Sequence, residues 1–270
     1  MGCHNLICDL ERERHKRICG LPTQECVGYK PHTSTGSVHD GITDSIMTRD
    51  NGGWMEITWY GHSCFRITDR GQATVVCDPY DSDHVGYQPL KLKADIVTVS
   101  HESPSHSYLK GVKGEPYVIS SPGEYEIGSV FITGLRTDHK TKNGTTQITN
   151  TLYLIDYNGI NIIHLGDMQQ VPTQAEVEAL GPVHIALIPV GGNESLNATK
   201  ASEVISLFEP NIIIPMHYAT PATTVELEPV DKFLKEMGLS SVETVPNFKV
   251  TSIESLPEET LVVILDYPHE

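Results

Sequence analysis

The sequence predicts an α/β fold in which two mixed β-sheets pack face to face and helices cover their outer surfaces. The 270 residues, 39% of them hydrophobic and 20% charged, have the composition of a globular protein long enough to bury a sizeable core. From Met55 onward, short apolar segments are separated by Gly, Pro and Asp turns. The early segments follow one another as hairpins and the later ones alternate with helical patterns, which is typical of mixed sheets with helices outside.

The first part of this region is expected to consist of strands. The first two would pair around a turn at Gly61, and the third would end in the turn-forming residues Asp78 and Pro79. The expected strands are 55–60, 64–68, 73–77, 94–99, 117–119, 124–127 and 130–135.

The pattern changes after residue 150, where helical segments begin to alternate with strands. Two apolar segments first flank Tyr157, Asn158 and Gly159, a combination that indicates a hairpin turn. The expected helices are 173–180, 200–208 and 230–237, and the expected strands are 151–156, 160–165, 184–190, 211–216 and 261–266.

Residues 1–54 differ from the rest of the chain, because they lack any sustained helical or strand period. Four of the six cysteines lie here and could indicate a metal or disulfide knot: Cys3, Cys8, Cys19 and Cys26. Their spacing matches no C-x-x-C pattern, and a cytosolic chain would keep its thiols reduced. We therefore expect residues 1–54 to be a poorly ordered extension and residues 55–270 to form one domain.

The charge balance argues against several classes of partner. The chain has 19 Lys and Arg against 35 Asp and Glu, a formal net charge of −16. Non-specific nucleic-acid binding and docking on an anionic membrane both need a cationic face, so neither is expected. No apolar run approaches the roughly 18–20 residues that span a bilayer, and the N-terminus has no apolar core of a secretory signal. A cytoplasmic protein with a small-molecule substrate is expected.

Residues that can bind metal ions follow four of the expected strands. They are His101 and His106 in one loop, and His139, Asp167 and His217 in three others. Any one histidine alone would more simply be a hydrogen-bonded loop residue. Imidazoles and a carboxylate that converge at one sheet edge are what a first-row metal ion needs, so the four strand ends together predict a metal site.

These segments resemble the metallo-β-lactamase superfamily, and within it the branch of ascorbate-6-phosphate lactonases and uncharacterised metal-dependent hydrolases. The resemblance covers residues 55–266, and the order and spacing of its segments are those of the family. The segments are ITWYGHSCFRI (57–67), VCDPY (76–80), VTVSHESPSH (97–106), PGEYEIG (122–128), NTLYLIDYNGINIIHLGDM (150–168), LIPVGGN (187–193) and IIPMHY (213–218). The resemblance implies a four-layer αββα sandwich, the metallo-β-lactamase fold, with a metal site at one edge.

The metal-binding signature of the family, H-x-H-x-D-H, is incomplete in this chain. His101 occupies its first position and His106 its last, but Ser103 stands at the second histidine and Ser105 at the aspartate. A serine hydroxyl is a poor metal ligand beside an imidazole or a carboxylate, and losing the aspartate removes a negative charge that offsets a dication. The resemblance therefore implies a metal site that has lost two ligands.

By the same resemblance, two half-sites share Asp167. One would combine it with His101 and His139, and the other with His106 and His217. Because each half-site lacks one ligand, the site is expected to hold one or two Zn or Mn ions, or none. The first half-site keeps its charge complement, so a single ion is expected at His101, His139 and Asp167. Asp138, Asp81, Asp83 or His84 could substitute as ligands.

The implied function is a metal-dependent hydrolase of a small ester, lactone or phosphodiester, with water activated at the catalytic Asp167. The alternative, favoured by Ser103 and Ser105, is a non-catalytic member of the fold that binds a ligand or partner in the former active-site cleft. The sequence leaves open whether His62 lies beside this cleft or only forms a turn. His164 lies within a strand and is expected to be a packed structural histidine.

A chain that begins at Met55 is expected to fold with a thermal stability similar to that of the full chain, because residues 1–54 have no periodic apolar face. Differential scanning calorimetry of both proteins measures this. A midpoint lowered by more than a few degrees would contradict the expectation, since it would mean that the N-terminal segment contributes on the order of 1 kcal/mol or more.

Overall fold

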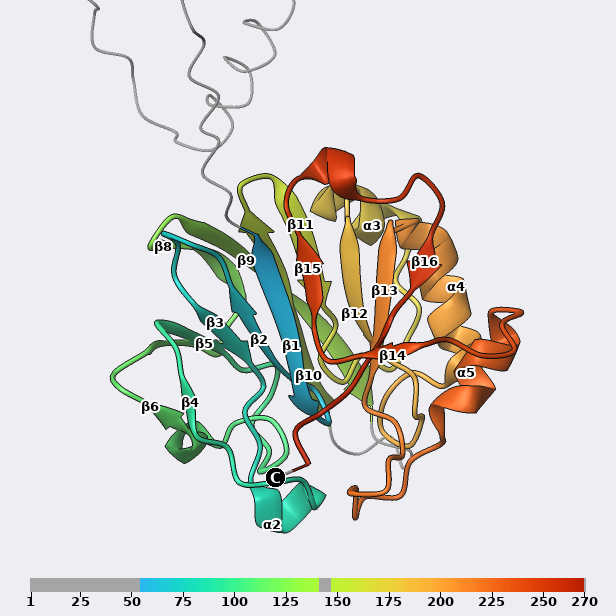
Figure 1. Ribbon diagram of the computed structural model, residues 1–270, viewed down its shortest axis with the longest axis horizontal. Coiled ribbons are helices and arrows are strands. Elements are labelled where there is room, and N and C mark those ends of the chain that lie inside the picture. Colours follow the sequence, from blue (N-terminus) through green and yellow to red (C-terminus); the bar gives the residue numbers. More distant parts are fainter. Residues whose placement is uncertain (1–53, 141–146, 270) are drawn as a thin grey trace, which may run out of the picture. The chain divides into compact units, whose positions relative to one another are not determined.

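Two β-sheets packed face to face form the part of the chain that the structure, a computed structural model, describes (Figure 1). This part comprises residues 54–140 and 147–269, and only the backbone is described for residues 138–140 and 147–148. The expectations for the N-terminal extension and its cysteines lie outside the described residues. The two sheets confirm the predicted fold class.

The first sheet contains the early hairpins of the chain. Its strands, in spatial order, are β15 (Phe248–Val250), β1 (Met55–Gly61), β2 (Cys64–Thr68), β3 (Val75–Cys77), β5 (Ile96–Thr98) and β7 (Tyr117–Ile119). β1, β2 and β3 are antiparallel neighbours, as the hairpin pattern predicted. β5 and β7 run parallel to β3, so this sheet is mixed.

The second sheet is also mixed. Its strands, in spatial order, are β16 (Leu261–Val262), β13 (Ile212–Met216), β12 (Ile185–Pro189), β11 (Ile160–His164), β10 (Gln147–Tyr157), β9 (Val130–Lys140) and β8 (Gly123–Ile127). β11, β12 and β13 run parallel, and every residue of β12 and β13 is buried, as is usual for parallel strands covered on both faces. The carboxyl ends of β11 and β13 therefore lie at the same edge of the sheet.

β9 and β10 extend further than their apolar patterns predicted. They pair in register from Asp156 opposite Phe131 to Gln147 opposite Lys140. The polar residues after Leu135 thus continue the ladder instead of forming a loop. As a consequence, His139 lies within β9 and does not follow a strand end as expected.

Helices cover the outer face of the second sheet. They are α3 (Gln174–Leu180), α4 (Ala198–Phe208) and α5 (Val230–Glu236), which lie on the side of β12, β13 and β16 in Figure 1. α4 starts two residues before its predicted position, because the Asn197 side chain accepts a hydrogen bond from the Lys200 N–H and caps the helix. None of the helices in the described residues is long and apolar enough to cross a membrane.

The first sheet is covered on its outer face by short elements that the sequence did not predict. They are α2 (Ser82–Val85), the 3₁₀ helix η1 (Leu109–Gly111) and the strand pair β4 (Leu92–Lys93) and β6 (Val112–Lys113). A separate apolar cluster joins them to the sheet, with Val85, Leu92 and Val112 packed near Val76 and Val97. The remaining elements are β14 (Thr244–Val245), β17 (Ile264–Leu265) and the 3₁₀ helix η2 (Ile253–Ser255).

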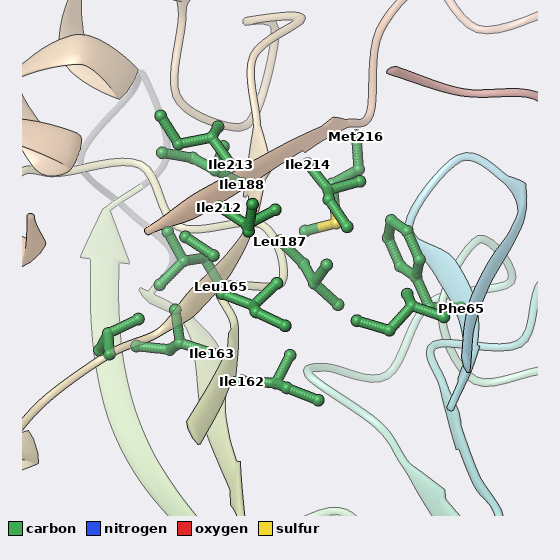
Figure 2. Close-up of a cluster of buried hydrophobic side chains, with 14 of the residues drawn as sticks. Phe65, Ile162, Ile163, Leu165, Leu187, Ile188, Ile212, Ile213, Ile214 and Met216 are labelled. Atoms are coloured by element: carbon green, nitrogen blue, oxygen red, sulfur yellow. The ribbon is translucent and has the colours of Figure 1, made fainter. Parts of the chain in front are cut away.

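The main apolar core lies between the two sheets. Figure 2 shows Ile162 and Ile214 of the second sheet on the side of Phe65, which belongs to β2 of the first sheet. Ile188 and Ile213 point to the opposite side, where the helices lie. Because the interior of a protein is close-packed, this core sets the distance between the loops that the two sheets carry.

Two tyrosines of β10 also tie the sheets together. The Tyr153 hydroxyl donates to the Val99 carbonyl oxygen at 2.8 Å and lies 3.1 Å from that of Ile119. The Tyr157 hydroxyl donates to the Ala73 carbonyl oxygen at 2.7 Å. Val99 directly precedes the loop that holds His101 and His106, so Tyr153 supports the base of that loop.

Replacing Tyr153 by Phe is expected to lower the free energy of unfolding by about 1–2 kcal/mol, because the buried Val99 carbonyl oxygen loses its donor. Urea denaturation followed by circular dichroism measures this. Tyr117→Phe, at a hydroxyl-bearing residue that is 55% exposed, is the matched control and should change stability little. Equal losses in both variants would show that Tyr153 does not tie the sheets.

Candidate metal centre

Loops from both sheets meet at one edge of the sandwich and bring four histidines and one aspartate together. His62 lies in the β1–β2 turn, and His101 and His106 lie in the loop after β5. Asp167 and His217 follow β11 and β13. Four of these side chains are buried, and His101 is partly exposed. The structure thus brings together all the predicted site residues whose side chains it describes, His101, His106, Asp167 and His217.

The carboxylate of Asp167 is the centre of this cluster. Its Oδ1 lies 3.2 Å from Nε2 of His106 and 3.4 Å from Nε2 of His217. Its Oδ2 lies 3.8 Å from Nε2 of His101. Oδ1 is nevertheless buried without a hydrogen bond of acceptable geometry. Three imidazole nitrogens therefore lie around this carboxylate, and Nε2 of His106 is also 3.3 Å from Ser63 Oγ.

Asp167 is held in place by its own backbone turn. Asn150 Oδ1 accepts a hydrogen bond from the Asp167 N–H at 2.9 Å, and Asn150 Nδ2 donates to the Leu165 carbonyl oxygen at 3.0 Å. Gly166 has a φ of +56°, and a Cβ at this position would collide with Asn150 and Ser100. The turn therefore requires glycine immediately before the aspartate, which explains the Gly-Asp pair.

Each of the three imidazoles around Asp167 is hydrogen-bonded to a serine through its other ring nitrogen, Nδ1. Such a bond fixes the orientation of the ring and leaves Nε2 directed at the carboxylate, as is usual for metal-binding histidines. The pairs are His101 with Ser100 (3.2 Å), His106 with Ser105 (2.8 Å) and His217 with Ser195 (3.1 Å).

The two serines at the missing signature positions contact each other, and one of them contacts the ring of His106. Ser103 Oγ and Ser105 Oγ lie 2.8 Å apart, and Ser105 Oγ is bonded to the Nδ1 side of His106, which is turned away from Asp167. Ser105 therefore supports the ring of His106 on the side opposite Asp167.

Asp78 fixes the start of the loop. Its buried carboxylate accepts two hydrogen bonds of 2.7 Å from Ser100, one from the backbone N–H and one from Oγ. Because Ser100 Oγ is also bonded to Nδ1 of His101, Asp78 positions this imidazole through the serine.

The charges of the cluster depend on one another. Burial opposes ionisation of Asp167, but the imidazoles of His106, His217 and His101 outweigh it and hold the pKa of the carboxyl well below its usual value. Burial also opposes protonation of His106, yet Asp167 raises the pKa of this histidine. At His217 burial prevails and lowers the pKa. An ionised carboxylate and a neutral imidazole, the forms that bind metal ions, are thus present together.

His62 belongs to the cluster, which the sequence had left open. Its ring centroid lies 4.3 Å from that of His217 and 5.0 Å from that of His106. The residue is 1% exposed, and neither ring nitrogen has a hydrogen-bond partner. His164 is different, since its Nε2 is bonded to the Ser63 carbonyl oxygen at 2.9 Å, as expected for a structural histidine.

Two groups of described residues have ligand atoms within 4.8 Å of one another: His62, His106 and His217, and His101, His106 and Asp167. The suggested substitutes Asp81, Asp83 and His84 contribute to neither group, and Asp81 instead caps α2. The backbone of His139 pairs with Ile148, but the side chains of His139 and Asp138 lie outside the described residues.

Known proteins are similar to this chain in sequence and in fold. A UPF0173 protein of Pyrococcus furiosus is 29% identical over 209 residues, which are 68% of this chain and 90% of that protein. A UPF0173 metal-dependent hydrolase of Methanocaldococcus jannaschii is 29% identical over 215 residues, 70% of this chain and 95% of that protein.

A solved structure from Thermotoga maritima, named as a member of the metallo-β-lactamase superfamily, is 37% identical. It superimposes with a TM-score of 0.65 and covers 79% of this chain and 100% of its own. The family model of the β-lactamase superfamily domain matches residues 56–217. The chain therefore belongs to the β-lactamase superfamily and has the metallo-β-lactamase fold.

Proposed function

We propose that this protein is a metal-dependent hydrolase that acts on a small ester, lactone or phosphodiester. The proposal rests above all on the buried Oδ1 of Asp167, which has no hydrogen bond and which Nε2 of His106 and His217 face at 3.2 and 3.4 Å. Relatives from Methanocaldococcus jannaschii and Thermococcus kodakarensis are named metal-dependent hydrolases. The Thermotoga maritima protein is named as a Zn-dependent hydrolase, which supports metal-dependent hydrolysis as the reaction class.

The donor set fits a divalent transition-metal ion. Catalytic zinc uses three protein ligands and leaves a further position open. Asp167, His106 and His217 would supply these three ligands. Nε2 of His101 lies 3.8 Å from the other carboxylate oxygen, Oδ2. A buried carboxylate is costly unless its charge is compensated, and a dication between these atoms would compensate it. Nε2 of His106 and of His217 lie closer to the carboxylate of Asp167 than Nε2 of His101 does, at 3.2 and 3.4 Å against 3.8 Å.

When bound, such an ion would polarise the substrate's carbonyl or phosphoryl oxygen and lower the pKa of a water molecule. The chain itself supplies the positioning. Asp167 stays ionised, and its Oδ2 is turned toward the more open His101, so it can accept a hydrogen bond from the attacking water. The side chains of His101 and Asp167 are 14% and 11% exposed and that of His106 is 0%, so substrate would enter beside His101.

A hollow of about 500 Å³ adjoins the loop between His101 and His106, with Glu102, Ser103 and Pro104 in its wall. Pockets for small molecules are of this size, ~300–1,000 Å³. The imidazoles do not line the hollow. It supports a small-molecule substrate near the loop, while the reaction class rests on the cluster around Asp167.

Replacing Asp167 by Asn is expected to lower the affinity for Zn²⁺ by more than about tenfold and to abolish hydrolysis, because it removes the charge shared by the imidazoles. Equilibrium dialysis with elemental analysis measures the affinity, and nitrophenyl esters and bis(p-nitrophenyl) phosphate report hydrolysis. Asp231→Asn, at an exposed aspartate of α5, is the control. If the parent binds no metal in excess Zn²⁺ or Mn²⁺, the hydrolase proposal is lost and the non-catalytic alternative stands.

The two half-sites can be separated by alanine substitutions. His217→Ala is expected to lower the bound metal per chain more than His139→Ala, because His217 faces the orphaned oxygen of Asp167. Elemental analysis of both variants, purified without chelator, measures this. A larger loss of metal in His139→Ala than in His217→Ala would place the ion at His101, His139 and Asp167. That is the half-site expected from sequence, because it keeps its charge complement.

A further inference from the structure

We propose that His62 is a metal ligand of this site and replaces the carboxylate lost at Ser105, so that the site prefers zinc over manganese. This inference rests on the proposed function and adds to it a ligand and the class of metal. It starts from the position of His62, which neither the H-x-H-x-D-H signature nor the strand-end pattern assigns to the metal.

The imidazole of His62 is buried, and its two nitrogens are unpaired. The residue is 1% exposed, and both Nδ1 and Nε2 lack a hydrogen-bond partner. Buried polar atoms in folded proteins are nearly always paired, and an exception calls for an explanation such as an ion. Its ligand atom lies within 4.8 Å of those of His106 and His217. A metal ion among the three would satisfy it.

The backbone holds His62 firmly against His217. The His62 carbonyl oxygen accepts hydrogen bonds from the His217 N–H and from Trp59 Nε1, both at 3.0 Å. His62 and His217 each have a φ of +52°, a left-handed conformation that is costly for residues other than glycine. Strain of this kind is typical of residues that a functional site holds in place. The two strained residues present their imidazoles to each other.

A purely structural role for His62 does not account for these observations. His164, also buried at this edge, has its Nε2 paired with a backbone carbonyl oxygen, as a structural histidine does. The contacts of His62 with the rings of His106 and His217 use only the ring faces and edges. A phenyl ring would make such contacts equally well without burying two unpaired nitrogens.

The donor set with His62 differs chemically from that of the family signature. In the signature, an aspartate stands where this chain has Ser105. In the group of His62, His106 and His217 all the ligand atoms are imidazole nitrogens, and the Asp167 carboxylate lies 3.2 and 3.4 Å from Nε2 of His106 and of His217. Imidazole ligands suit zinc, copper and nickel, whereas carboxylate-rich sites suit manganese. The exchange of a carboxylate for an imidazole therefore shifts the preference toward zinc.

A thiolate at position 62 tests direct contact with the metal. The full-length parent, His62→Cys and the control His84→Cys, at an exposed position of α2, are each titrated with Co²⁺. We expect a near-ultraviolet thiolate-to-cobalt charge-transfer band in His62→Cys only. Absence of the band in a His62→Cys protein that binds cobalt would overturn the proposal.

Affinity provides a second readout that does not depend on activity. His62→Asn, which tolerates a positive φ, is expected to bind Zn²⁺ at least about tenfold more weakly in competition with a chromophoric chelator. His62→Asp should narrow the preference for Zn²⁺ over Mn²⁺. Circular dichroism of the metal-free variants verifies their fold. Unchanged zinc affinity in folded His62→Asn overturns this proposal alone, whereas a parent that binds no metal overturns the proposed function with it.

Discussion

The buried carboxylate of Asp167 is the constraint on which the arrangement of this edge depends. A charge removed from water must be compensated by nearby groups, and here Nε2 atoms of His106, His217 and His101 lie 3.2, 3.4 and 3.8 Å from its oxygens. The imidazoles come from both sheets, so the compensation requires the whole sandwich. A serine behind each ring fixes it in this orientation.

The packing of the two sheets and the geometry of the centre are therefore linked. The first sheet carries His62, His101 and His106, and the second carries Asp167 and His217. Their separation is set by the core and by a few polar connections. Tyr153 ties β10 to the base of the histidine loop, and the His217 N–H donates directly to the His62 carbonyl oxygen. A substitution that shifts one sheet would therefore change the distances between the imidazole nitrogens and the carboxylate of Asp167.

Local pattern was sufficient to predict much of the fold. Continuous apolar segments such as 212–216 became buried parallel strands, and Tyr157, Asn158 and Gly159 formed the expected hairpin turn. The ends of β9 and β10 were missed, because the residues beyond Leu135 are polar, and only their pairing in the ladder shows that the strands continue. α2, β4 and β6 are too short to have a period, and they exist through their packing on the first sheet.

The residues of the site were also predicted only in part. Histidines and the aspartate at strand ends could be found from sequence, because parallel strands bring their ends to one edge. His62 could not be assigned, since Gly61-His62 serves equally well as an ordinary turn, and only its contacts with His106 and His217 show otherwise. The serines were predicted as lost ligands, but the hydrogen bond of Ser105 to His106 depends on a ring orientation that no local pattern encodes.

The most direct test of this account is to locate the bound ion by anomalous scattering at the zinc edge, in crystals of the full chain grown with Zn²⁺. We expect a peak bounded by Asp167, His106, His217 and His62. No peak at saturating zinc, or a peak beside His101 and His139 and remote from His62, would contradict it.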